Sequence, residues 1–284
     1  MKNPNLFSFL VFLIVAFTCV EAVAEIKMGV FPRRSVEATQ KAFQPLAEHL
    51  SKMLGEEVKL IVPASFKDFW KGVKQNQFDL VHYNQYHYIR SKKELGHRVI
   101  VANEEFGNKQ IAGALSVRKD SGVHSIAELR GKVILFGGGT KAMGSYIAPT
   151  AMLKKAGLVA GKDYMVNFAM NPPSAVVGTY NKGAGAAGSG NVVLRLKATT
   201  KQIKAEDMQI IAESEPFTQL PWAVNSHVSV ELADKIQKIM TSLKNSEAGR
   251  SVLKAAKVTD FYAVTDKDFD KVREITKYAL GEDY

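Results

Sequence analysis

A glycine-rich run is the stretch of this chain best suited to bind a ligand. It covers residues 136–146 and reads FGGGTKAMGSY. Residues 131–135 (GKVIL) ahead of it predict a buried strand, and residues 148–156 after it predict a helix that Gly157 ends. Glycines let backbone N–H groups come close to a ligand, and the first turn of a helix leaves its N–H groups unpaired. This order of strand, turn and helix predicts a site for a small anion or polar ligand.

The run matches neither of the common nucleotide-binding fingerprints, because it has no GxGxxG spacing and no GKS or GKT. The alternative interpretation is a tight turn that binds nothing. If the turn does bind, we expect the ligand to contact Gly138, Gly139, Thr140, Lys141, Met143, Gly144 and Ser145.

A second polar cluster covers residues 82–88 and reads HYNQYHY. It follows a short predicted strand and opens a predicted helix, so it is expected to form the opposite wall of the site. The candidate ligand-binding side chains here are Tyr83, Asn84, Gln85 and Tyr88. Two alternatives stay open. The cluster is a half-buried helix start, or the histidines at 82 and 87 bind a metal, although their spacing departs from the i, i+4 pair that holds zinc. We expect no metal.

Three further residues complete the expected site. Arg33 follows the predicted first strand, at the end where α/β sheets place ligands, and its guanidinium could pair with an oxyanion. Ser189 and Asn191 lie at the end of the small-residue segment 184–190, which we expect to be a loop that opens a helix over 191–197. Neither expected wall contains a carboxylate, which favours an anion or a neutral polar ligand over a cation.

These candidates sit on a chain in which predicted strands and helices alternate, the pattern of an α/β protein. A chain that leaves one α/β unit, builds a second and returns crosses twice between them, and we expect the crossings at 115–122 and 214–226. The predicted lobes are therefore residues 25–117 plus 218–284 and residues 118–217, with a ligand cleft between them and a hinge at the crossings. Trp222, beside the second crossing, either packs the hinge or closes over the ligand.

The first 24 residues have the features of a secretory signal peptide: Lys2, an apolar run over 6–17, and the Ala22-Val23-Ala24 cleavage pattern. We expect cleavage after Ala24 and a periplasmic chain that begins at Glu25. The alternative is a lipoprotein anchored at Cys19, but Thr18 fits that motif poorly. Because Cys19 is the only cysteine, the mature chain would have neither a disulfide nor a catalytic thiol.

Composition and motifs exclude other classes of function. The net charge of +10 comes without an aromatic and basic strand motif, so we expect no nucleic-acid partner. The chain has no G-x-S-x-G elbow, no H-E-x-x-H pair and no clear pair of catalytic carboxylates. We therefore expect a binding protein, with no catalytic residues and no cofactor.

The order of several short segments resembles the periplasmic phosphate/phosphite/phosphonate-binding proteins of ABC importers. The resemblance covers essentially the whole mature chain and rests on these segments: 28–32 (MGVFP), 44–50 (QPLAEHL), 78–81 (FDLV), 118–122 (RKDSG), 129–132 (LRGK) and 149–157 (PTAMLKKAG). It implies a bilobal, type II solute-binding fold, a small oxyanion ligand, and delivery by a monomer to an ABC transporter permease.

The chain differs from that family at positions that are expected to contact the ligand. The family's glycine turn usually continues as Ser-Thr-Ser-Gly, whereas this chain has Ala142-Met143-Gly144-Ser145. An aspartate that the family often has in a second glycine-rich segment aligns with Gly190. The lost hydroxyl and carboxyl groups would otherwise bond a buried phosphonate. A second hypothesis is therefore a receptor of the same fold that binds another small ligand and signals to a membrane sensor kinase.

Overall fold

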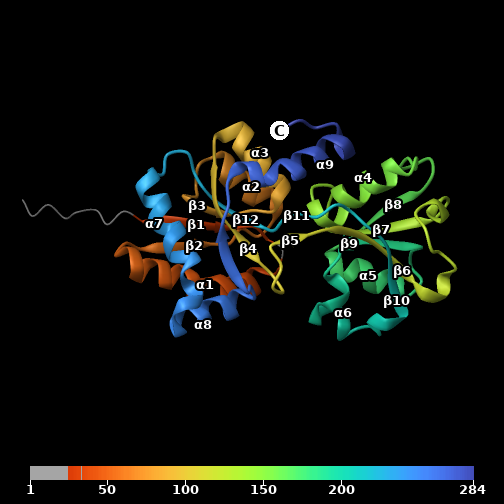
Figure 1. Cartoon of the computed structure of the whole chain (residues 1–284), viewed down its shortest axis with the longest axis horizontal. Helices are drawn as coiled ribbons and strands as arrows, with labels where there is room; N and C mark the ends of the chain where they lie inside the picture. The colour runs from red at the N-terminus through yellow and green to blue at the C-terminus, as the bar shows by residue number, and fades with distance from the viewer. Residues whose placement is uncertain (1–24, 33) are drawn as a thin grey trace, which may run out of the picture.

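The computed structural model describes residues 25–32 and 34–284, which form two α/β lobes side by side (Figure 1). The predicted two-lobed α/β architecture is confirmed. The predictions for the signal peptide, Cys19 and Arg33 lie outside the described residues. Within these residues, no helix is both long enough and apolar enough to cross a bilayer.

The first lobe is built on a six-stranded sheet in the order β13-β4-β12-β3-β1-β2. Its strands are β1 (Ile26–Val30), β2 (Val58–Ile61), β3 (Leu80–His82), β4 (Arg98–Glu104), β12 (Pro221–Val224) and β13 (Asp260–Ala263). The helices of this half are α1 (Val36–Leu54), α2 (Phe66–Lys74), α3 (Gln85–Leu95), α7 (Val230–Thr241) and α8 (Glu247–Ala256). β1 runs parallel to β2 and β3, so the ends of β1 and β3 reach the same edge, where the site begins.

The second lobe is built on a five-stranded sheet in the order β10-β6-β9-β7-β8. Its strands are β6 (Gly113–Arg118), β7 (Val133–Gly137), β8 (Met165–Ala169), β9 (Ala186–Gly190) and β10 (Met208–Glu213). Its helices are α4 (Ala148–Lys155), α5 (Pro172–Tyr180) and α6 (Lys197–Thr200). β7 lies parallel to both β8 and β9, so the turn that leaves β7 begins at an interior position of the sheet.

Two chain segments join the lobes. A short antiparallel ribbon lies between the sheets, where β5 (Gln110–Ile111) pairs with β11 (Phe217–Thr218). The expected first crossing at 115–122 is wrong, because β6 already pairs with β9 from Gly113 onward. That crossing lies earlier, around β5, and the apolar run through 111–117 concealed the break between the two strands. The exact lobe boundaries remain a prediction.

Helix α9 (Asp270–Leu280) lies across both lobes (Figure 1). It packs against α3 of the first lobe and against α4 of the second. Val272 and Ile275 of α9 belong to the same buried apolar cluster as Met143 and Ile147, the first and last residues of the helical turn that leads into α4. The helix therefore makes apolar contacts with both lobes.

Local signals explain the first helix. Ser35 caps α1 by accepting the N–H of Ala38, and Gly55 ends it in the left-handed region at φ 75°. The buried face includes Phe43, Leu46 and Leu50, which recur at helical spacing. The cap, the apolar spacing and the glycine stop are all local features of the sequence, so α1 needs no long-range contact to set its bounds.

The small-residue segment 184–190 differs from its prediction. We expected a loop that opens a helix, but Ala186–Gly190 is the buried strand β9, and a short 3₁₀ turn over Val193–Arg195 follows it. The reason is steric. A Cβ on Gly188 would lie 2.3 Å from the Cδ1 atom of Phe136 and 2.7 Å from the carbonyl oxygen of Ser145. Only a strand of small residues lets the turn after β7 lie directly on the sheet.

Replacing Gly188 by Ala should therefore destabilise the second lobe. We expect the free energy of unfolding to fall by about 1–3 kcal/mol, as for other overpacked core positions. Urea unfolding followed by circular dichroism measures this change. Gly139→Ala is the matched control and should keep the wild-type midpoint, because a Cβ there meets no atom within 4 Å. Equal midpoints for both variants would contradict the packing of the turn on β9.

Candidate ligand-binding site

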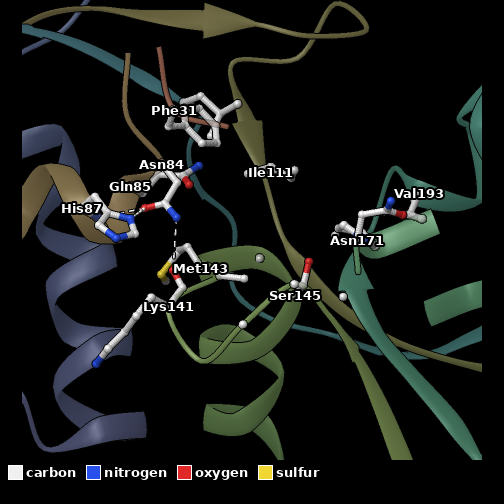
Figure 2. Close-up of a pocket in the computed structure, with 18 of the residues that line it drawn as sticks. Phe31, Asn84, Gln85, His87, Ile111, Lys141, Met143, Ser145, Asn171 and Val193 are labelled. Carbon is white, nitrogen blue, oxygen red and sulfur yellow. Dashed lines mark hydrogen bonds between the residues drawn. The ribbon is translucent and has the colours of Figure 1, made fainter. Parts of the chain in front are cut away.

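A cavity with a volume of about 410 Å³ lies between the lobes. This volume lies within the range of about 300–1,000 Å³ that is typical of small-molecule sites. The cavity is lined by Phe31, Pro32, Phe66, Asn84, Gln85, His87, Glu105, Ile111, residues 137–145, Met170, Asn171, Pro172, Gly190, Val192, Val193, Phe217, Gln219 and Leu220. Figure 2 shows the two walls facing each other, with Asn84 and His87 opposite Met143 and Ser145.

The second-lobe wall is the predicted turn. β7 ends at Gly137, Gly138 turns the chain at φ 89°, and a single π-helical turn over Met143–Ile147 leads into α4. Within the described part of the chain, several backbone N–H groups of this wall donate no hydrogen bond. They belong to Gly139, Thr140, Lys141, Met143, Gly144 and Ser145. Unpaired N–H groups at the start of a helix are the usual backbone site for an anion.

This wall is held close to the sheet by glycines. A Cβ on Gly113 would lie 3.0 Å from the carbonyl oxygen of Gly144, and a Cβ on Gly188 would meet that of Ser145. The first turn of the helix therefore rests on bare backbone of β6 and β9. Ser145 is buried, and Figure 2 shows its hydroxyl pointing into the space between the walls.

The first-lobe wall is organised by Asn84, the N-cap residue of α3. Its Oδ1 accepts the backbone N–H of His87 at 2.8 Å and also lies 2.8 Å from Nδ1 of that ring. Its Nδ2 donates to the carbonyl oxygen of Lys141 at 3.1 Å, which joins this wall to the glycine turn. Gln85 is held in the same way, since its Nε2 donates to the carbonyl oxygen of Thr218 at 3.0 Å.

His87 is a neutral side chain in this wall. Oδ1 of Asn84 can only accept, so Nδ1 of His87 carries the hydrogen and Nε2 is the unprotonated nitrogen. Burial, helped by the positive charges of Arg90 and Lys141, lowers the pKa of His87 to about 3. The ring stacks on Phe66 with centroids 5.6 Å apart. His87 therefore offers an acceptor and no positive charge at neutral pH.

Two charged side chains change the expected electrostatics. Lys141 lines the cavity through its backbone, but its ammonium donates to Glu282 at 2.7 Å and points away from the cavity (Figure 2). Glu105 lines the cavity and is buried, with its Oε1 accepting from Asn103 at 3.0 Å. The two expected walls contain no carboxylate, but Glu105, which lies outside both, adds one to the cavity lining. Glu105 lies just beyond β4, where its backbone N–H donates to the carbonyl oxygen of Asn108, and no sequence signal singled it out.

The structure brings nine of the predicted residues to the cavity: Asn84, Gln85, Gly138, Gly139, Thr140, Lys141, Met143, Gly144 and Ser145. Their role in binding stays a prediction.

Four other predicted residues do not line the cavity. The hydroxyl of Tyr83 contacts Nδ1 of His97 at 2.9 Å, and the hydroxyl of Tyr88 donates to Asp266 at 2.6 Å. Ser189 lies buried in β9, and the amide of Asn191 donates to Glu213 at 2.9 Å. The tyrosines were misplaced because helical periodicity shows which residues share a face but not which neighbour covers that face.

Sequence reasoning missed much of the apolar lining. Phe31, Phe66, Ile111, Phe217 and Leu220 carried no signal that distinguished them from core residues. Asn171 had a detectable signal, because an Asn before two prolines is typical of a helix N-cap, and it caps α5 beside the turn.

The metal interpretation of the histidine pair has no support in the described residues, where no three His, Cys, Asp or Glu side chains gather around a possible ion. His82 stacks on Trp222 with centroids 4.3 Å apart. Trp222 itself is fully buried and donates to Asn103, which favours its packing role.

Tyr88→Phe should lower stability and leave ligand affinity unchanged. The variant removes the hydrogen bond to Asp266, so we expect the free energy of unfolding to fall by about 1–2 kcal/mol. Urea unfolding and calorimetric titration with methylphosphonate measure the two quantities. A loss of ligand affinity with unchanged stability would indicate that the hydroxyl of Tyr88 contacts the ligand instead.

Acid should destabilise the protein through two buried histidines. Burial lowers the pKa of His87 to about 3 and that of His97 to about 4, so the unfolded chain binds more protons below its usual histidine pKa of 6.5. Stability is therefore full above pH 6.5 and falls as the pH drops, by at most about 2 kcal/mol per histidine between pH 7 and pH 5.

Urea midpoints at pH 7 and pH 5 measure this loss. His97→Gln should show a smaller loss than the wild type, whereas replacement of the exposed His124 by Gln should keep the full loss. An equal loss in the wild type and His97→Gln would contradict the assignment.

Comparison with known proteins agrees with this architecture. A binding-protein component of an ABC phosphonate transporter from Pseudomonas aeruginosa superimposes with a TM-score of 0.76 at 16% identity, covering 90% of this chain and 86% of that one. A Prochlorococcus marinus (MIT 9301) protein in complex with methylphosphonate gives 0.76 at 16% identity, covering 89% and 97%. A Xanthomonas citri protein bound to a chloride ion gives 0.80 at 12% identity, covering 90% and 98%. At these identities the likeness concerns the fold.

A comparison with models of protein families identifies a family as well as a fold. Residues 28–269 match the model of the family described as "ABC transporter, phosphonate, periplasmic substrate-binding protein". The matched stretch runs from β1 to the last residue before α9 and so includes both walls of the cavity. The chain belongs to this family of periplasmic substrate-binding proteins of ABC transporters.

Proposed function

We propose that this protein captures a small oxyanion outside the cytoplasm and delivers it to an ABC importer. The observation that carries the proposal is the set of unpaired backbone N–H groups between Gly139 and Ser145, on one wall of the interlobe cavity. Hydrogen bonds from N–H groups to an anion are stronger than those between neutral groups, and a water-poor cleft strengthens them further.

The charged groups around the cavity limit which kinds of ligand are expected to bind. The ammonium of Lys141 is occupied by Glu282, and Glu105 places a negative group in the lining. The donors left for an oxyanion include the backbone of the turn, the hydroxyl of Ser145 and the buried side-chain amide of Gln219, which has no hydrogen-bond partner among the described residues. These groups suit an anion of low charge better than one of high charge, since no described ammonium or guanidinium faces the ligand.

The apolar lining suggests a substituent on that anion. Phe31, Ile111, Phe217 and Leu220 lie around the cavity on the side of the interlobe ribbon. A phosphonate with a small alkyl group would place its oxygens on the turn and its carbon atoms against these side chains. This choice agrees with the family and accommodates the lost Ser-Thr-Ser-Gly hydroxyls.

The remaining parts of the proposal concern the setting of the protein. We infer that the signal peptide is cleaved after Ala24, and that the mature chain works as a periplasmic monomer without a nucleic-acid partner, a cofactor or catalytic activity. Its partner is the permease of the importer. The alternative partner, a membrane sensor kinase, is favoured by no observation on this chain.

Thermal-shift screening followed by calorimetry tests the ligand. Methylphosphonate, ethylphosphonate, phosphite, phosphate and sulfate form the panel. At 100 times its Kd, a ligand should stabilise the protein by about 2.7 kcal/mol. We expect the alkylphosphonates to bind most tightly, and a complete lack of binding by the panel would contradict the oxyanion proposal.

Gly144→Leu should abolish binding and leave the fold intact. A Cβ at this position meets only the Cα of Gly190, at 3.8 Å, so the backbone tolerates a side chain that then fills the space before the turn. We expect methylphosphonate affinity to fall by about a hundredfold or more, because several charge-assisted hydrogen bonds are blocked together.

Calorimetry measures the affinity, and circular dichroism verifies the fold. The Tyr88→Phe variant is the control and should bind like the wild type. Wild-type affinity in Gly144→Leu would place the ligand elsewhere.

A further inference from the structure

The C-terminal tail makes a polar contact with the ligand-binding turn. α9 ends at Leu280, and Gly281 turns the chain back in the left-handed region at φ 73°. The carboxylate of Glu282 then accepts from the ammonium of Lys141 at 2.7 Å, from the hydroxyl of Tyr86 at 2.7 Å and from that of Tyr284 at 2.9 Å. One carboxylate thus joins three segments that are distant in sequence.

These segments belong to different parts of the molecule. Lys141 is part of the turn on the second lobe, and Tyr86 lies in α3 of the first lobe. The ammonium of Lys141 also lies 4.8 Å from the centre of the Tyr86 ring, and its carbonyl accepts from Asn84. Both ends of Lys141 are therefore held by groups outside the second lobe.

The contact combines an ion pair with two further hydrogen bonds, while the side chains of Lys141 and Glu282 stay 40% and 32% exposed. Burial alone would raise the pKa of Glu282, but the hydrogen bonds from Lys141, Tyr86 and Tyr284 hold that pKa below its usual range. Tyr86 is buried as a residue, and the hydrogen bond of its hydroxyl to Glu282 is partly shielded from water. Charge-assisted hydrogen bonds that share a partly buried acceptor reinforce one another, whereas an exposed pair contributes little.

We propose that Glu282 is a positioning residue for the ligand site, through which the tail holds the turn of Gly138–Ser145 against α3 and slows ligand release. This inference rests on the proposed function of the turn. Glu282 does not line the cavity among the described residues, so it acts on the ligand through Lys141. It also keeps the ammonium of Lys141 directed away from the ligand.

The chain offers a matched control in the same tail. Asp283 accepts from Lys277 at 3.1 Å, and both side chains are well exposed. This pair connects α9 only to the residues that follow it, so it has no link to the turn. Asp283→Asn removes one negative charge from the tail, as Glu282→Gln does, and leaves the Lys141 contact in place.

A double-mutant cycle tests the proposal, with the full mature chain and methylphosphonate as the probe. The variants are Glu282→Gln, Lys141→Met, the double variant, and Asp283→Asn. Calorimetry gives Kd and stopped-flow fluorescence gives the dissociation rate. We expect each of the first two single variants to raise Kd and the dissociation rate by about three- to tenfold, and the double variant to add nothing further. Asp283→Asn should match the wild type.

Hydrogen exchange of the ligand-free proteins supplies a second readout. The N–H groups of Tyr146 and Ile147 donate to the carbonyl oxygen of Ala142, at 2.9 and 3.1 Å, and report on the turn. These N–H groups should exchange faster in Glu282→Gln and in Lys141→Met. Their exchange rates should be unchanged in Asp283→Asn. Unchanged exchange in Glu282→Gln would overturn the proposal, and so would additive or tighter binding in the cycle. If methylphosphonate fails to bind the wild type, the ligand proposal fails, and the exchange rates still decide the role of Glu282.

Discussion

The direct contact between the turn after β7 and the bare backbone of its own sheet is the constraint on which the site depends. Gly113 and Gly188 leave no Cβ where the carbonyl oxygens of Gly144 and Ser145 approach. The turn can therefore begin its helix against the sheet and leave its first N–H groups facing the cavity instead of pairing them with the chain. The interlobe contacts of Asn84 and Glu282 then act on a turn whose shape the sheet has already fixed.

This constraint explains an unusual feature of the electrostatics. The ammonium of Lys141, a residue of the cavity lining, pairs with Glu282, and the buried Glu105 also belongs to the lining. Backbone N–H groups can bind an oxyanion without a cation because they are fixed before the ligand arrives and need no reorganisation. Such a site would favour an anion of low charge, as the proposed ligand requires.

The sequence predicted the features that depend on local chemistry. The α/β class, α1 with its Ser35 cap and the glycine turn followed by its helix could all be predicted, because capping and periodicity are local signals. The helix that begins after the polar cluster at 82–88 was also predicted. Features that depend on long-range packing were not predicted. The hydroxyl of Tyr88 donates to Asp266, which is far away in the sequence. The small residues of β9 were read as a loop, because the sequence does not show that Phe136 packs against Gly188.

The central claim is that backbone N–H groups of the turn bind the oxyanion, and nuclear magnetic resonance tests it most directly. In nitrogen-15-labelled protein with methylphosphonate, the amides of Gly139, Thr140, Gly144 and Ser145 should shift, and at least some should show a scalar coupling to phosphorus across the hydrogen bond. If the ligand binds and these amides stay unshifted while others respond, the turn is not the anion site.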